Sequence, residues 1–123
     1  MHATLLFQLR QNLERLYAQP IPIDKAADQL ALRMMLASTI RHLRALHAYT
    51  PVSLQDTLRL RRVTLLEQES QALAPPGKVA LGTWNLLHTY LKETIEAALS
   101  DAAESYFHAE RSELLRAEEH QLR

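Results

Sequence analysis

Apolar residues recur at steps of three and four along most of the chain, which is the spacing of an amphipathic helix. The first such stripe predicts a helix from about Ala3 to Ala18. This helix ends before Pro20, because proline lacks the backbone N–H and restricts the residue before it. The members of the stripe are Leu6, Leu9, Leu13 and Leu16.

A second helix is predicted from about Asp24 to Ala48, with Asp24 as its N-cap. Its apolar residues fall on two lines rather than one. The first line is Leu30, Met34, Ala37 and Arg41, and the second is Leu32, Leu36, Ile40, Leu43 and Leu46. We therefore interpret it as the central helix of the fold, contacted from more than one side.

A third helix is predicted from about Leu54 to Leu73, after a turn at Pro51. Ser53 and Asp56 resemble a capping box, with Asp in place of the preferred Glu. The predicted apolar face of this helix is Leu54, Leu58, Leu65 and Ala72. The sequence Pro75-Pro76-Gly77 then gives the strongest break in the chain.

The last segment is predicted to be helical from Gly82 or Thr83 to about Gln121. One uninterrupted helix of this length would measure roughly 57 Å, more than the other helices can cover. Either Ser100 caps a new helix that begins at Asp101, or the helix continues and its far end packs against another chain. The continuous helix is favoured, because neither proline nor glycine lies near residue 100.

These elements predict an all-α protein: an antiparallel bundle of four to five helices with a long C-terminal helix. The 123 residues suit a single domain over 1–123, with residues 110–123 either frayed or packed against a partner. The predicted core consists of Leu13, Leu30, Met34, Leu36, Leu58, Leu65, Trp84, Leu87 and Leu91. No apolar run reaches the length of a membrane span and no signal-peptide pattern is present, so we expect a cytoplasmic protein without a membrane partner.

The zero net charge of the chain conceals two segments of opposite sign. Residues 33–62 contain six arginines and one acid, a net of +5, whereas residues 93–123 contain eight acids and three arginines, a net of −5. Segments of opposite sign attract each other within one molecule or between molecules. The basic segment is also able to meet a polyanion such as nucleic acid.

Five arginines form the strongest candidate site, because a helical hairpin brings them to one end of the bundle. They are Arg41, Arg44, Arg59, Arg61 and Arg62. They are expected to bind an acidic protein surface or nucleic acid. The leading hypothesis is a non-enzymatic helical adaptor or small subunit that acts through protein–protein contacts and forms a homo-oligomer. The alternative is a nucleic-acid-binding accessory subunit that uses this basic hairpin.

The segment from Arg41 to His47 resembles the short Arg-to-His signature of the HEPN superfamily, which comprises small helical-bundle ribonucleases and toxins. The resemblance implies RNA cleavage, with Arg41 holding a phosphate and His47 moving a proton. The chain departs from the family in placing the motif early, and Arg41 and His47 point to different sides of a continuous helix. With no cysteine and no paired Glu-x-x-His motifs, the sequence predicts no metal site and no cofactor.

Overall fold

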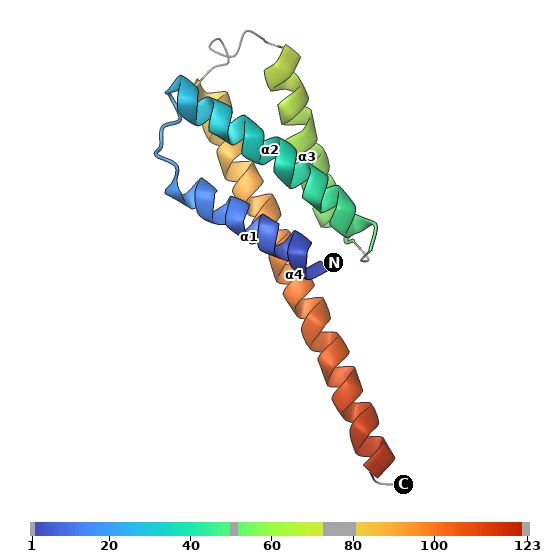
Figure 1. Cartoon of the computed structure of the whole chain (residues 1–123). Helices are drawn as coiled ribbons and strands as arrows, with labels where there is room; N and C mark the ends of the chain where they lie inside the picture. The colour runs from blue at the N-terminus through green and yellow to red at the C-terminus, as the bar shows by residue number, and fades with distance from the viewer. Residues whose placement is uncertain (1, 50–51, 73–80, 122–123) are drawn as a thin grey trace.

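The computed structural model describes residues 2–49, 52–72 and 81–121, and over these residues the protein is all-α (Figure 1). The helices are α1 (His2–Ala18), α2 (Ala26–His47), α3 (Leu54–Ala72) and α4 (Leu81–Gln121). This architecture confirms the predicted helical bundle. The break predicted at Pro75-Pro76-Gly77 lies outside the described residues.

The core lies between α1, α2 and the first half of α4, with α3 contributing mainly Val63. The predicted core residues Leu36, Trp84, Leu87 and Leu91 are fully or almost fully buried. The other fully or almost fully buried apolar side chains among the described residues are Leu9, Leu16, Ile23, Leu32, Leu43, Val63 and Ile95. Full burial of one such side chain stabilises the fold by about 1.5–3 kcal/mol before the loss of conformational entropy is subtracted.

Part of the predicted core is wrong, because four of its members lie on the surface. Leu30 and Met34 of α2 are 60% and 67% exposed, and Leu58 and Leu65 of α3 are 52% and 51% exposed. Leu13 is only half-buried and packs against the edge of the core.

The error has one physical cause in both helices: each carries two apolar lines, and only one of them meets the bundle. Helix α2 buries the line that contains Leu36 and exposes the line that contains Arg41. Helix α3 buries Val63, which lies opposite the line of Leu58, Arg61 and Leu65. On α2, Arg41 in the exposed line favours contact with water, since burying an unpaired guanidinium is costly.

The helix starts follow the sequence in one case and depart from it in the other. Helix α2 begins at Ala26, and its N-cap is Lys25, which makes no side-chain capping bond, so the predicted Asp24 cap is wrong. Helix α3 does begin after the predicted cap: the backbone N–H of Asp56 donates to Ser53 Oγ at 3.1 Å. The Asp56 carboxylate, however, accepts a hydrogen bond from Arg59.

Buried polar groups fix how α1 sits against its neighbours. Asn12 Nδ2 donates to Ser38 Oγ and Thr39 Oγ1, each at 3.2 Å, and joins α1 to α2. On the other side of α1, His88 Nε2 donates to the Leu16 carbonyl at 2.7 Å. Burial lowers the pKa of His88, so this imidazole is neutral at physiological pH. Each bond satisfies a group that would be expensive to bury alone.

Helix α4 is continuous through Ser100, which confirms the predicted continuity of this helix. Its first half packs within the bundle, and its second half runs straight out beyond the ends of α1, α2 and α3 (Figure 1). We call residues 102–121 the distal half of α4; it is about 30 Å long at 1.5 Å per residue. Within the described ranges, no helix has both the length and the apolar character needed to cross a membrane.

Candidate interaction surface

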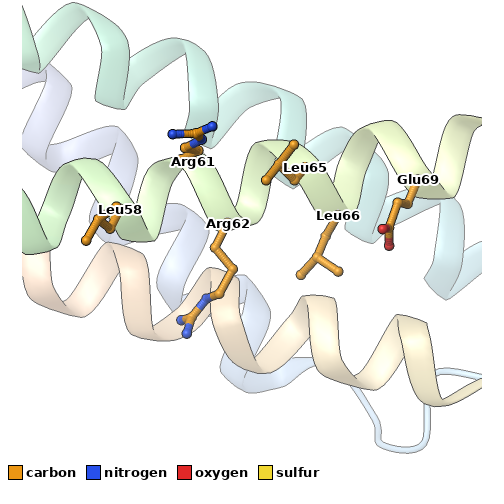
Figure 2. A pocket seen from close by; sticks show the side chains of 6 residues that line it. All are labelled: Leu58, Arg61, Arg62, Leu65, Leu66 and Glu69. Carbon is orange, nitrogen blue, oxygen red and sulfur yellow. The ribbon is translucent and has the colours of Figure 1, made fainter.

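The structure divides the five predicted arginines into two groups. Arg59 and Arg62 lie on the side of α3 that faces α4, and both make ion pairs within the chain. Arg41 and Arg44 of α2 and Arg61 of α3 are exposed on the outside of the bundle. Figure 2 shows the division on α3, where Arg62 points toward α4 and Arg61 points away from it.

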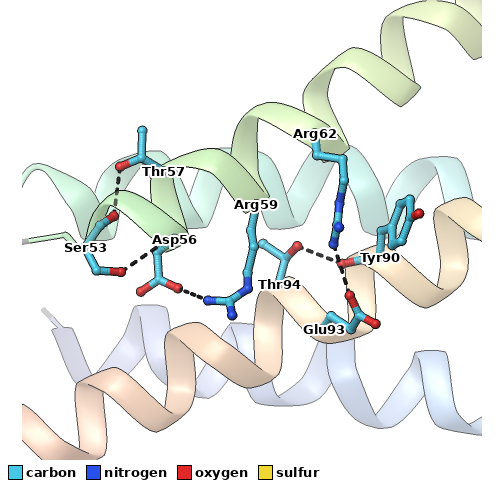
Figure 3. Close-up of polar contacts among 8 residues, drawn as sticks. All are labelled: Ser53, Asp56, Thr57, Arg59, Arg62, Tyr90, Glu93 and Thr94. Carbon is cyan, nitrogen blue, oxygen red and sulfur yellow. Dashed lines mark hydrogen bonds and ion pairs between the residues drawn. The ribbon is translucent and has the colours of Figure 1, made fainter.

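Arg59 belongs to a network that secures the start of α3 (Figure 3). Its Nη1 donates to Asp56 Oδ1 at 2.9 Å, and Asp56 is itself buried. The Thr57 hydroxyl donates to the Ser53 carbonyl, so that the first turn is closed by side chains as well as by the backbone. Arg59 is therefore engaged in the fold rather than available to a ligand.

Arg62 joins α3 to α4 in two ways. Its Nη2 donates to Glu93 Oε2 at 3.0 Å. Its guanidinium carbon lies 3.6 Å from the centroid of the Tyr90 ring, within the range of a cation–π contact (Figure 3). A guanidinium that is stacked and paired at once is a structural contact, and neither Tyr90 nor Glu93 was identified from the sequence.

Asp56 and Asp101 form a carboxyl pair at the point where α4 leaves the bundle. A hydrogen bond to Asp56, together with partial burial and the charge of Asp56, raises the pKa of Asp101 to about 6. Burial alone would raise the pKa of Asp56, but hydrogen bonds from Asp101, Arg59 and Ser53 outweigh it and lower that pKa. Below about pH 6, Asp101 is therefore the protonated member of the pair. Above about pH 6 both carboxylates are negatively charged and repel each other.

A groove of about 470 Å³ runs between α2 and α3 on the outside of the bundle. It is lined by Ala37, Ile40, Arg41 and Arg44 of α2 and by Thr64, Glu67 and Gln68 of α3. Two of the predicted arginines thus lie at a concave surface.

Exposed apolar side chains follow the groove on both helices. On α2 the exposed line is Leu30, Met34, Ala37 and Arg41; on α3 it is Leu54, Leu58, Arg61 and Leu65, with Leu54 as much as 75% exposed. A smaller hollow of about 270 Å³ opens on α3 itself, where Figure 2 shows Leu58, Leu65 and Leu66 with Arg61, Arg62 and Glu69. We call these two lines, together with Arg44, the outer face.

The outer face is unusual for the surface of a small protein, because large apolar side chains lie along two neighbouring helices. Periodicity alone predicts that four residues of these lines lie in the core, namely Leu30, Met34, Leu58 and Leu65. On α2 the sequence contains a signal of their true position, because Arg41 lies in the exposed line and the buried line contains no arginine. On α3 it contains none, because Arg59 and Arg62 lie on the side that faces α4. A mixture of apolar side chains and arginine is typical of protein–protein interfaces.

The Arg41–His47 pair does not form a joint site. Both residues lie on α2, and their six-residue separation turns them about 120° apart around the helix. Arg41 is exposed on the outer face, whereas His47 is half-buried, and burial lowers its pKa. Among residues 2–49, 52–72 and 81–121 no three acidic or histidine side chains are placed to hold a metal ion.

No family model, curated protein or solved structure matches the chain. The surfaces of the chain itself are therefore what bear on its function, and two of them stand out: the outer face and the distal half of α4.

Proposed function

We propose that this protein is a non-enzymatic helical adaptor or small subunit that acts through protein–protein contacts and associates with itself. The observation that carries the proposal is the distal half of α4, which extends about 30 Å beyond the bundle (Figure 1). Ala103 and Glu104 are already exposed where this segment begins, and Leu115, Arg116 and Ala117 are exposed near its end.

An isolated helix of this length is only marginally stable in water, because most helical stability in proteins comes from packing against other elements. A second chain that packs against the distal half would supply that stability. Leu115, which is 59% exposed, gives such a partner an apolar contact.

The outer face supports the same proposal from the side of the bundle. It leaves five large apolar side chains at least half exposed, namely Leu30, Met34, Leu54, Leu58 and Leu65. Covering what remains exposed would contribute on the order of 5 kcal/mol, at roughly half of the 1.5–3 kcal/mol expected for each full burial. Association itself is opposed by about 4–15 kcal/mol, so the burial of these five side chains has to be supplemented by further contacts for association to be stable.

Sedimentation velocity over a range of concentrations tests this function. We expect the sedimentation coefficient to rise between low micromolar and several hundred micromolar protein as the oligomer forms. A chain that sediments as a monomer throughout that range would rule out self-association as its mode of action.

Nucleic-acid binding is the second candidate, and the exposed Arg41, Arg44 and Arg61 favour it. Three exposed guanidinium groups on one face are able to contact phosphates. Electrophoretic mobility shifts with RNA and DNA at low and moderate salt test this function, with the Arg41→Glu/Arg44→Glu variant as the comparison. If wild type and variant shift RNA and DNA equally, this face is excluded as a nucleic-acid site.

A further inference from the structure

We propose that the outer face binds the distal half of α4 from a second copy of this chain, and that the exchange is reciprocal in a two-fold dimer. This inference rests on the proposed function and adds to it the two surfaces that meet. It is argued from apolar exposure, charge, direction and length.

The outer face offers both parts of a helix-binding surface. Its exposed apolar lines flank the groove of about 470 Å³, whose lining carries two arginines, Arg41 and Arg44, against one acid, Glu67. Among the described residues, Arg41, Arg44 and Arg61 make no ion pair. A helix that lies along this face therefore meets apolar side chains beneath it and positive charge beside it.

The distal half of α4 has the complementary charge. Residues 102–121 contain five acids and two arginines, a net of −3. This sign also decides between two ways of pairing the copies. Two distal halves laid against each other would bring together segments of like charge, whereas a distal half on the outer face brings opposite charges together.

The contact has to form between molecules. Helix α4 is continuous from Leu81 to Gln121, and its distal half points away from the bundle of its own chain (Figure 1). The acidic segment therefore cannot fold back onto Arg41 or Arg44 without breaking the helix. The intramolecular charge contacts that do form, such as Arg62 with Glu93, use the part of α4 within the bundle.

The lengths of the two surfaces match. The distal half measures about 30 Å, and α2, with 22 residues, measures about 33 Å. Two contacts about 30 Å long and about 10 Å wide would bury on the order of 1,200 Å² in total, which is the size of a small specific interface. A two-fold arrangement uses both copies of each surface and closes the assembly at a dimer.

A charge swap between two full-length variants tests the proposal. The face variant is Arg41→Glu/Arg44→Glu, and the tail variant is Glu104→Arg/Glu118→Arg. Each alone pairs like charges, so we expect the dissociation constant of each homodimer to rise at least about tenfold. Mixed in equal amounts, the two variants pair opposite charges in both contacts, and we expect dimerisation to return to near the wild-type level.

The matched control is Arg10→Glu/Arg15→Glu, which makes the same charge change at exposed positions of α1, away from the outer face. It is expected to leave the dissociation constant within about twofold of wild type. An equal loss in this control would show a general effect of net charge and overturn the proposal.

Other outcomes are equally decisive. A wild-type dimer that the face variant leaves unchanged, while Leu115→Glu weakens it, overturns the outer face as the binding site but keeps the proposed self-association. A wild-type chain that remains monomeric removes the self-association and this inference together. A face variant that loses RNA retention but dimerises as wild type does assigns the arginines to nucleic acid, and this too overturns the proposal.

Discussion

The orientation of α3 can be tested by comparing two substitutions on its opposite sides. Val63 is completely buried, so Val63→Ala removes two methyl groups from a packed site. The lost transfer free energy is about 1.6 kcal/mol at 0.8 kcal/mol for each group, and the cavity that remains adds to it. We therefore expect the free energy of unfolding to fall by about 2–3 kcal/mol.

Leu58→Ala removes three carbons, one more than Val63→Ala does, from a side chain that is 52% exposed. Since about half of its surface is hydrated in the folded monomer, the expected loss is no more than about 1 kcal/mol. The higher helix propensity of alanine offsets part of even that loss. Val63→Ala is thus expected to destabilise the monomer more than Leu58→Ala does. Residue size alone predicts the opposite order.

Urea unfolding followed by circular dichroism at low protein concentration measures both effects on the monomer. With a slope of about 1–3 kcal/mol per molar urea, Val63→Ala is expected to lower the midpoint by about 1–2 M and Leu58→Ala by less than half as much. A loss for Leu58→Ala that equals or exceeds that for Val63→Ala would refute this orientation of α3. Repeated at high concentration, Leu58→Ala should lose additional stability if the outer face is occupied in the proposed dimer.

Three further predictions concern caps and titrating groups. Ser53→Ala removes the acceptor of the Asp56 N–H and should lower the stability by about 1 kcal/mol, measured by urea unfolding. The pKa of Asp101 is raised to about 6, so its contribution to the stability of the fold is present at low pH and is lost as the pH rises from about 4 through 6. Asp101→Asn should therefore raise the melting temperature at pH 8 but not at pH 4.5. The pKa of His88 is lowered, so its contribution to stability is present above pH 6.5 and is lost as the pH falls below that value. His88→Gln should therefore make the melting temperature less dependent on pH below 6.5. An unchanged pH dependence would contradict the lowered pKa of His88.

The sequence predicts the helices well, because each boundary depends on local chemistry. Pro20 ends α1 and Ser53 starts α3, and both act within one or two turns. The continuity of α4 was also predictable, since nothing near Ser100 breaks a helix. The predicted Asp24 cap is the exception: α2 begins one residue later, after Lys25, and the side chain of Lys25 does not cap it.

The side of each helix that meets the core was less predictable, because two apolar lines compete on α2 and on α3. Periodicity detects both lines but does not show which has a partner. On α2 the line that contains Arg41 faces water, whereas on α3 arginines lie on both the exposed side and the side that faces α4. The candidate site was affected in the same way. The sequence predicts one patch of five arginines, but two of them turn inward. Arg59 pairs with Asp56 in the first turn of α3, and Arg62 pairs with Glu93 of α4, which lies far away in the sequence.

Because α4 is continuous, its orientation within the bundle also sets the position of its far end. The first half lies in the bundle and the distal half extends beyond it, so a small tilt of the first half becomes a large displacement of the C-terminal end of the helix. A rotation of about 10° around Asp101 would move the end of a 30 Å arm by about 5 Å, roughly one helical turn. The seam that holds α4, made by Arg62, Tyr90 and Glu93, therefore sets where a distant surface is presented as well as how stable the bundle is.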